Sequence, residues 1–316
     1  MRALGLEPLT PPFSSRRTLD LGVRHCPEMT CAPCKILFGN YYEGLERGAD
    51  ELTLFGGPDT CRLGYLAQIQ TRRLQEAGFQ FMPHTLSLRG IAADLLRLTR
   101  ELADLAPLEL VEAARTLLAR LSLVDELEQE VLKLRPRELS RGVANDLRAE
   151  ALNAARACRD RAEIQERRAE ILDPLRTEAR DRDRRVYRVV LVGDIYSISE
   201  PSFNMNLEQQ LGYLGVVVAR WFWLSKSLRL SVVDRFLHWD EMQAQEEELA
   251  RYLGRDVGGF AYPSLKGAVS SLQTGVHGLI HLAPFDCSPE IVAASVLPQL
   301  ARDHDVPLLS LSFDEQ

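Results

Sequence analysis

Five cysteines lie where they could bind a metal or carry out redox chemistry. Cys26, Cys31 and Cys34 fall in the stretch H-C-P-E-M-T-C-A-P-C-K, and Cys61 follows in F-G-G-P-D-T-C-R. Cys287 lies far downstream in A-P-F-D-C-S-P-E, where its surroundings resemble those of Cys61, since each follows a short apolar run and precedes a predicted helix. Thiolates are ligands of zinc and of iron–sulfur clusters. The similarity suggests one site built from both ends of the chain.

The composition excludes several classes of protein. The chain has 316 residues, 26% of them charged, with a net charge of −7 and no basic block, so nothing favours binding to nucleic acid. No apolar run reaches the length of a membrane span, and the first residues lack the apolar core of a signal peptide. We therefore expect a cytoplasmic protein with no membrane contact, in which clustered cysteines indicate metal or redox chemistry more often than disulfides.

Strands and helices alternate around the first cysteines. The pattern predicts helices over residues 16–23, 35–47 and 63–77 and strands over 4–9, 51–55 and 79–83, with Gly48 and Gly78 ending two of the helices. Alternation of this kind predicts a parallel α/β layer.

The middle of the chain is helical in character. Leucines three and four residues apart predict an amphipathic helix: Leu95, Leu98, Leu102 and Leu105. Three prolines, Pro107, Pro136 and Pro174, separate further helical stretches rich in charges of both signs. The segment from 147 to 185 is either a solvated helical layer or a surface for a partner. Cys158 has no other cysteine near it in sequence and is predicted to be a spectator.

The α/β pattern resumes at residue 186. Strands are predicted over 186–194, 216–222, 278–283 and 306–312, and helices over 207–214, 241–253, 268–273 and 289–302. Asn204 or Asn206 is expected to cap the helix that starts at residue 207. We therefore predict an α/β fold in three parts: a first α/β domain at 1–88, a helical region at 89–185 and a second α/β domain at 186–316.

Cys61 and Cys287 are each predicted between the carboxyl end of a strand and the start of a helix, where ligands bind in open α/β sheets. Cys31 and Cys34 also precede a helix, and the positive end of a helix dipole stabilises thiolates. An iron–sulfur cluster suits such a site. The spacing C-x4-C-x2-C also matches plant-type 2Fe-2S ferredoxins, four thiolates could hold structural zinc, and unliganded cysteines remain an alternative. Nothing indicates a P-loop, a dinucleotide fingerprint or a Ser/His/Asp triad.

Four segments resemble one known family. R-R-T-L-D-L-G-V-R-H-C-P-E-M-T-C-A-P-C-K-I-L-F-G-N, G-A-D-E-L-T-L-F-G-G-P-D-T-C-R-L-G-Y, V-G-D-I-Y and H-L-A-P-F-D-C-S-P-E-I-V-A are similar to the 2-hydroxyacyl-CoA dehydratase D-component family. The similarity is greatest to its stand-alone branch, which is labelled as related to CoA-enzyme activases. It covers both α/β parts, whereas the helical middle matches only in character.

The resemblance implies two Rossmann-like domains around a helical one. It also implies a 4Fe-4S cluster held by Cys31, Cys61 and Cys287, with one iron left open. Cys34 occupies a place that varies in the family, so it is either a fourth ligand or idle. Relatives with double-cubane clusters use six thiolates, and this chain has six cysteines. Because Cys158 lies outside the motifs, we expect a single cubane.

The resemblance further implies single low-potential electrons from an ATP-dependent activator and reductive or dehydrating chemistry on an acyl-CoA or other small molecule. A homo- or heterodimer is compatible with it. We therefore predict an iron–sulfur component of a lyase or oxidoreductase. The alternatives are a non-catalytic cluster-carrying or electron-transfer subunit, which would close its cluster with Cys34 or Cys26, and a zinc-stabilised ligand-binding module.

Charged neighbours of the ligands are further candidates. His25 and Arg62 could supply positive charge near a cluster or substrate, with structural hydrogen bonding as the alternative. Glu28 and Glu290 lie within three residues of a cysteine, where capping of a helix is the simpler role.

The chain also departs from the family, because the usual opening strand and helix and the final helix are not evident in it. We therefore expect the first sheet to lack its first strand, and no acyl-CoA-binding motif can be identified.

Overall fold

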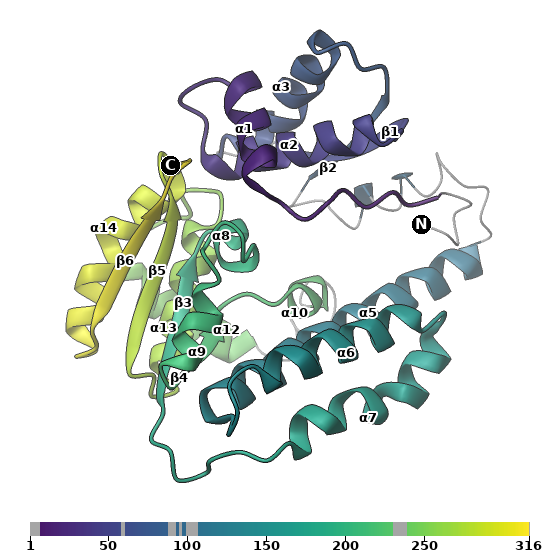
Figure 1. The fold of residues 1–316 in the computed structure, drawn as a ribbon. Helices are drawn as coiled ribbons and strands as arrows, with labels where there is room; N and C mark the ends of the chain where they lie inside the picture. The colour runs from purple at the N-terminus through teal and green to yellow at the C-terminus, as the bar shows by residue number, and fades with distance from the viewer. Residues whose placement is uncertain are drawn as a thin grey trace.

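Two parallel β-sheets and a layer of long helices make up the described part of the chain (Figure 1). The computed structural model describes residues 7–57, 61–87, 93–94, 97–98, 107–229 and 239–315. The fold is mixed α/β with parallel strands, as the alternating sequence pattern predicts. None of the described helices combines the length and the apolar character that a membrane span requires.

The first sheet contains two parallel strands among the described residues, β1 (Glu51–Gly56) and β2 (Met82–Ser87), and helix α3 (Leu63–Glu76) lies between them in sequence. Side chains of β1 alternate, and Leu52 and Leu54 point into the core. Phe38 of helix α2 (Ala32–Glu46) packs in the same core. The sheet and its helices therefore form one packed unit that holds the loops of Cys31 and Cys61.

Helix α1 (Arg16–His25) packs against α2 with backbone touching backbone. A Cβ atom added to Gly22 would lie 1.9 Å from the Lys35 carbonyl oxygen, and one added to Gly39 would lie 1.9 Å from the Thr18 carbonyl oxygen. Any larger residue would push the two helices apart. This close approach fixes the end of α1 beside the first turn of α2.

The helical layer consists of α5 (Pro107–Leu134), α6 (Val143–Ala157) and α7 (Arg161–Thr177), with the short 3-10 turn η2 (Arg135–Arg137) after α5. These helices share a core that includes Leu127, Ile164 and Leu172. Pro107 begins α5, as expected, and Pro136 lies in η2. The expectation that Pro174 separates two helical stretches is wrong, because this proline lies inside the last turns of α7. Most of the helix predicted around residues 95–105 lies outside the described residues.

The second sheet has four parallel strands in the order β4-β3-β5-β6. They are β3 (Tyr187–Gly193), β4 (Val216–Arg220), β5 (Gly278–Pro284) and β6 (Leu308–Phe313). Because side chains alternate along a strand, Val190 and Val192 face one side of the sheet and Leu191 faces the other. Both faces are covered, which explains the continuous apolar character of β3.

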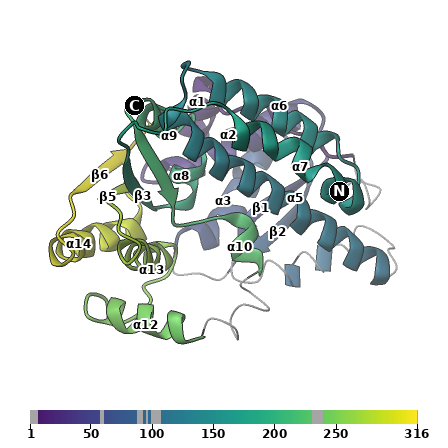
Figure 2. The ribbon, with the colours of Figure 1, turned by 90° about the horizontal axis from the view of Figure 1, so that it is seen from below.

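One face of this sheet is covered by α13 (Ala261–Leu272) and α14 (Ser288–Asp303), with α12 (Trp239–Ala250) farther out (Figure 2). The other face packs against α8 (Ile195–Ser199) and α9 (Leu207–Tyr213), and also against Leu132 of α5 and Ile36 of α2. The short helix α10 (Leu224–Arg229) lies beside α5 (Figure 1). The carboxyl edge of the second sheet thus faces α2 of the first unit (Figure 1).

The observed elements differ from the predicted ones mainly at their ends. The strand predicted over 79–83 is β2, which begins at Met82 because residues 79–81 complete the turn after Gly78, where φ is +96°. The strand predicted over 4–9 is wrong for residues 7–9, which are irregular, and residues 4–6 lie outside the described part. Of the two predicted capping residues of α9, Asn206 occupies the N-cap position without a side-chain capping bond, whereas Asn204 Oδ1 accepts from the Leu207 amide at 3.2 Å.

Candidate functional site

Three cysteine loops end in helix N-termini. Cys31 is the N-cap residue of α2, Cys287 is the N-cap residue of α14, and Cys61 directly precedes the N-cap residue of α3, Arg62. A proline follows in the first turn of α2 and of α14, where its missing N–H costs nothing. The first backbone N–H groups of a helix have no partner within it, so each loop presents donors and a positive dipole end to its thiol.

The structure brings the Cys61 loop and the Cys287 loop together. Arg62 Nη1 donates to Asp286 Oδ2 at 2.8 Å and also to the carbonyl oxygen of Met29, two residues before Cys31. One guanidinium group therefore bridges all three cysteine loops.

Gly259 lies between the same loops. A Cβ atom built on it would lie 3.3 Å from Cys61 Cβ and 2.6 Å from the ring of Pro289, two residues after Cys287. Cys61 and Pro289 thus face each other across a residue that has no side chain. Gly259 also has φ of +59°, which L-residues rarely adopt.

The environment of Cys31 and of Cys287 disfavours unliganded thiolates. Burial raises the pKa of Cys31 to about 11, and the negative charges of Asp194 and Cys61 add to the effect. Burial likewise raises the pKa of Cys287 well above its usual range, with further contributions from Asp194, Glu290 and Cys31. Each of these thiols therefore lies within the electrostatic range of another. A bound cationic group would lower the pKa of these thiols again, because it stabilises the thiolates.

Asp194 occupies the point at which the strand order of the second sheet reverses. The chain passes from β3 outward to β4 and then returns to place β5 on the other side of β3, so the crevice between β3 and β5 is the expected ligand site of the sheet. Asp194 follows β3, and Cys287 follows β5. Asp194 Oδ2 accepts from the Ser197 amide at 2.9 Å and from its hydroxyl at 3.0 Å, while burial raises the pKa of Asp194 to about 6.

Sequence reasoning missed Asp194. It quoted V-G-D-I-Y only as a family segment and gave no role to the aspartate. The signal was available, because the aspartate follows a buried strand just as Cys61 and Cys287 do. A polar residue at the carboxyl end of a parallel strand is a candidate site residue by position alone.

Cys34 contacts both Cys26 and Cys31, since its amide donates to the Cys31 carbonyl oxygen at 3.0 Å and its thiol bonds to Cys26. Cys34 is fully buried, and Gln70 Nε2 lies 3.7 Å from its Sγ and 3.1 Å from its carbonyl oxygen. Its thiol donates a hydrogen bond to Cys26, which lowers the pKa of Cys26 and, with burial, raises that of Cys34. Cys158 is elsewhere, in the core of the helical layer, with its Sγ 3.4 Å from the Ala154 carbonyl oxygen.

The two proposed cationic residues have different surroundings. Arg62 belongs to the site, as described above. The His25 ring stacks on Phe38 and on Tyr42, with centroids 5.5 Å apart in both cases, and burial lowers the pKa of His25. These contacts give His25 a packing role at the end of α1, with no contact to Cys31, Cys61 or Cys287 shown in the described part of the chain.

The two glutamates also differ. Glu28 is exposed, and its carbonyl oxygen accepts from Lys35 Nζ at 3.0 Å. Glu290 is only 1% exposed, and its Oε2 lies 2.9 Å from Nε2 of the equally buried His281. The other oxygen, Oε1, has no hydrogen-bond partner within the described structure. The buried pair lies one turn behind Cys287, and a pocket of about 320 Å³ that both residues line opens beside the Cys287 loop.

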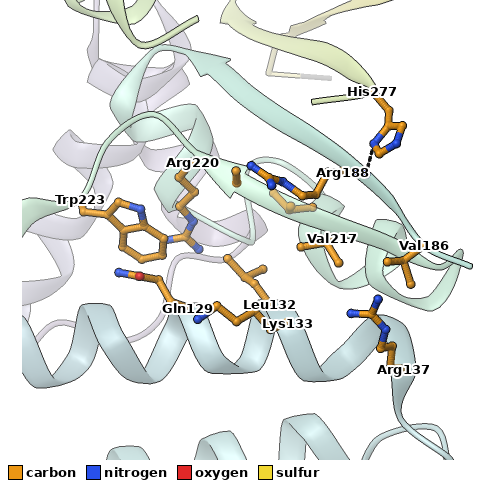
Figure 3. Close-up of a pocket in the computed structure, with 12 residues that line it drawn as sticks. Gln129, Leu132, Lys133, Arg137, Val186, Arg188, Val217, Arg220, Trp223 and His277 are labelled. Carbon is orange, nitrogen blue, oxygen red and sulfur yellow. Dashed lines mark hydrogen bonds between the residues drawn. The ribbon is translucent and has the colours of Figure 1, made fainter. Parts of the chain in front are cut away.

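A second pocket, of about 440 Å³, lies between α5 and the strands β3 and β4 (Figure 3). Figure 3 shows Lys133 on α5 and Arg137 in η2 on one side, with Arg188 and Arg220 on the strands across from them. Glu208 neutralises Arg220, and Glu130 lies 3.0 Å from Lys133. The lining runs from residues that precede β3 and β5 to Trp223 after the end of β4, and it includes none of the three cysteines of the candidate site.

Across the described residues, no three His, Cys, Asp or Glu side chains are close enough to hold one metal ion.

Comparisons with known proteins give no second line of evidence on function. No model of a known protein family matches this chain, and no curated protein is found to be similar to it. The function is therefore argued from the geometry of the site.

Proposed function

We propose that Cys31, Cys61 and Cys287 hold a 4Fe-4S cluster and that the protein is a component of a reductive or dehydrating enzyme similar to the 2-hydroxyacyl-CoA dehydratases. In this proposal the two α/β parts are Rossmann-like domains, residues 1–88 and 186–316, on either side of a helical region. Electrons come from an ATP-dependent activator, and the substrate is an acyl-CoA or another small molecule. A dimer of identical or different subunits is part of the same proposal.

One observation carries the proposal. Three cysteine loops that are far apart in sequence meet at the carboxyl edge of the second sheet, where the Arg62–Asp286 ion pair and Gly259 join them. That edge is also where the strand order reverses, the usual ligand site of an open α/β sheet.

The donors fit the group. Thiolates bind iron–sulfur clusters, and three helix N-termini with one guanidinium group provide the positive field that an anionic cluster needs. When bound, a cluster held by three thiolates supplies one-electron transfer and an iron that acts as a Lewis acid on a substrate oxygen.

The contacts of Cys34 support an open cluster over a closed one. An electron carrier is expected to complete its cluster with a fourth thiolate. Cys34 is buried in the first unit, where it bonds to Cys26 and Gln70. Recruiting it would cost both of these contacts, so the enzyme fits the structure better than the carrier.

The chain's own residues would serve the reaction in two ways. Asp194 has a pKa of about 6, so its carboxyl group is able to accept or release a proton near neutral pH. Arg62 places a positive charge at the rim of the site, where it attracts an anionic substrate and holds the loops in place.

The test is anaerobic purification followed by assays for iron and acid-labile sulfide. Replacing Cys31, Cys61 or Cys287 by alanine should each remove most of the iron, the sulfide and the broad absorption at the blue edge of the visible range. Cys158→Ala and Cys34→Ala should retain them. Stoichiometric zinc without sulfide would instead establish the zinc-stabilised module.

The open position has its own test. Cyanide or a hydroxyacyl thioester should change the EPR spectrum of the reduced wild-type protein. Two results together would instead indicate an electron carrier. Cys34→Ala would lose as much iron as Cys61→Ala, and no ligand would change the EPR spectrum of the wild-type protein.

A further inference from the structure

A second pair of thiols lies next to the cluster site and is not used by it. Cys26 is the residue that ends α1, and Cys34 lies in the first turn of α2. Their side chains share a hydrogen bond, and both belong to one apolar cluster. Cys26 is 8% exposed and Cys34 is fully buried, so only Cys26 has an edge that solutes reach.

The packing of the two helices holds the pair in place. Gly22 and Gly39 allow the backbones of α1 and α2 to touch, and the Cys26 amide donates to the Gly22 carbonyl oxygen at 2.8 Å. Gln70 holds Cys34 from the other side through both the sulfur and the carbonyl oxygen. The two thiols, which share a hydrogen bond, are therefore held close together by the packing of α1, α2 and α3, as formation of a disulfide requires.

We propose that Cys26 and Cys34 form a redox-active dithiol, which a two-electron thiol oxidant such as glutathione disulfide converts into an intrachain disulfide. Cys26 is the attacking thiol, because it is the less deeply buried of the two and it accepts the hydrogen bond from Cys34. The buried amine of Lys35 contributes a positive charge that favours its thiolate.

The reaction balances as two exchanges. The Cys26 thiolate attacks one sulfur of glutathione disulfide, forms a mixed disulfide and releases a glutathione thiolate. Cys34 then loses its proton and attacks Cys26 Sγ, so that the Cys26–Cys34 bond forms and the second glutathione leaves. The protein thiols give up two electrons and two protons, and glutathione disulfide takes up both.

The test is thiol labelling of the full-length chain over a series of glutathione redox buffers. The reduced protein should take up six alkyl labels under denaturing conditions, one for each cysteine, and the oxidised protein two fewer. Trypsin releases residues 25–35 as one peptide containing Cys26, Cys31 and Cys34. Its fragmentation spectrum should place the new bond between Cys26 and Cys34 and the label on Cys31.

Variants make the assignment specific. Cys26→Ser and Cys34→Ser should each abolish the loss of two labels, whereas Cys158→Ser, also at a buried cysteine, should retain it. The wild-type peptide alone decides the matter if a variant fails to fold. Labels on both Cys26 and Cys34 at every glutathione ratio, or a bond to Cys31, would overturn the proposal.

The outcome is separable from that of the cluster assay. Labelling is carried out before and after iron reconstitution, and the disulfide needs no iron. A protein that forms the disulfide but binds no iron refutes only the proposed function. One that binds iron but never forms the disulfide refutes only this inference.

Discussion

Arg62 and Asp286 form an ion pair of 2.8 Å between residues that are 224 positions apart in the sequence. One residue follows Cys61 and the other precedes Cys287, so the pair joins the first α/β unit to the second sheet at the site itself. The side chain of Arg62 is half exposed, so solvent screens the attraction. The pair therefore contributes more to the positioning of the Cys61 and Cys287 loops than to the free energy of unfolding.

Removing this ion pair should change iron retention more than stability. For Asp286→Asn we expect the free energy of unfolding to fall by about 1 kcal/mol or less, as for other exposed pairs. The reconstituted cluster should be lost to a chelator several times faster, because the two loops are no longer tied. Arg73→Ala, which removes an exposed pair with Glu76, is the control and should leave the loss rate unchanged. Equal rates for Asp286→Asn and wild type would contradict the positioning role.

Gly259→Ala should damage the site through shape alone. The new methyl group would lie 2.6 Å from the ring of Pro289, and the φ of +59° is unfavourable for alanine. We expect a loss of about 1–3 kcal/mol in stability and a lower iron content. Gly254→Ala is the matched control, since a Cβ there meets nothing within 4 Å. Denaturant unfolding and iron assays measure the stability and the iron content of both variants. Similar losses in the two would show that the site does not require glycine at position 259.

Asp194→Asn should alter the pH dependence of stability in the metal-free protein. Folding raises the pKa of Asp194 from 3.8 to about 6, so the folded state favours the protonated carboxyl. The stabilisation from this group is complete below pH 3.8 and is lost as the pH rises through about 6. The loss amounts to about 3 kcal/mol or less. Asparagine carries no charge, so urea unfolding between pH 4 and 7 should show a flatter profile. An unchanged profile would show that Asp194 does not titrate in this range.

Gly22→Ala should separate α1 from α2. Its methyl group would lie 1.9 Å from the Lys35 carbonyl oxygen, so the helices must move apart, at an expected cost of about 2 kcal/mol. Gly44→Ala, in the same helix pair but facing open space, should gain up to about 1 kcal/mol from helix propensity. Thermal unfolding compares the two. Because Cys26 follows Gly22 by one helical turn, Gly22→Ala should also slow formation of the Cys26–Cys34 disulfide, and an unchanged rate would speak against this geometry.

Much of the fold could be predicted from local pattern. Buried parallel strands such as β3 and β5 are short β-branched or apolar runs, and glycines end the helices between them. Those signals depend on neighbouring residues alone. Pro174 misled the prediction because a proline near the end of a helix removes a single backbone hydrogen bond, which α7 tolerates through packing.

The site was partly accessible to sequence reasoning. The surroundings of Cys61 and Cys287 indicate the ends of strands, which is why their convergence could be expected. The order of the strands could not, since pairing between distant segments leaves no local signal, and so the crevice beside Asp194 was missed. The contact between Cys26 and Cys34 also depends on how α1 crosses α2, which the spacing of two cysteines does not determine.

The long separation of the cysteine loops also affects how the protein folds. Contacts between segments more than two hundred residues apart form late, because the chain entropy of closing so large a loop must be overcome first. The helical layer and the first sheet, built from nearer neighbours, are expected to form earlier. Substitutions at the Arg62–Asp286 contact should therefore act mainly by speeding unfolding, with folding rates almost unchanged. A group bound by all three cysteines would stabilise the same long-range contacts and would therefore slow unfolding of the protein.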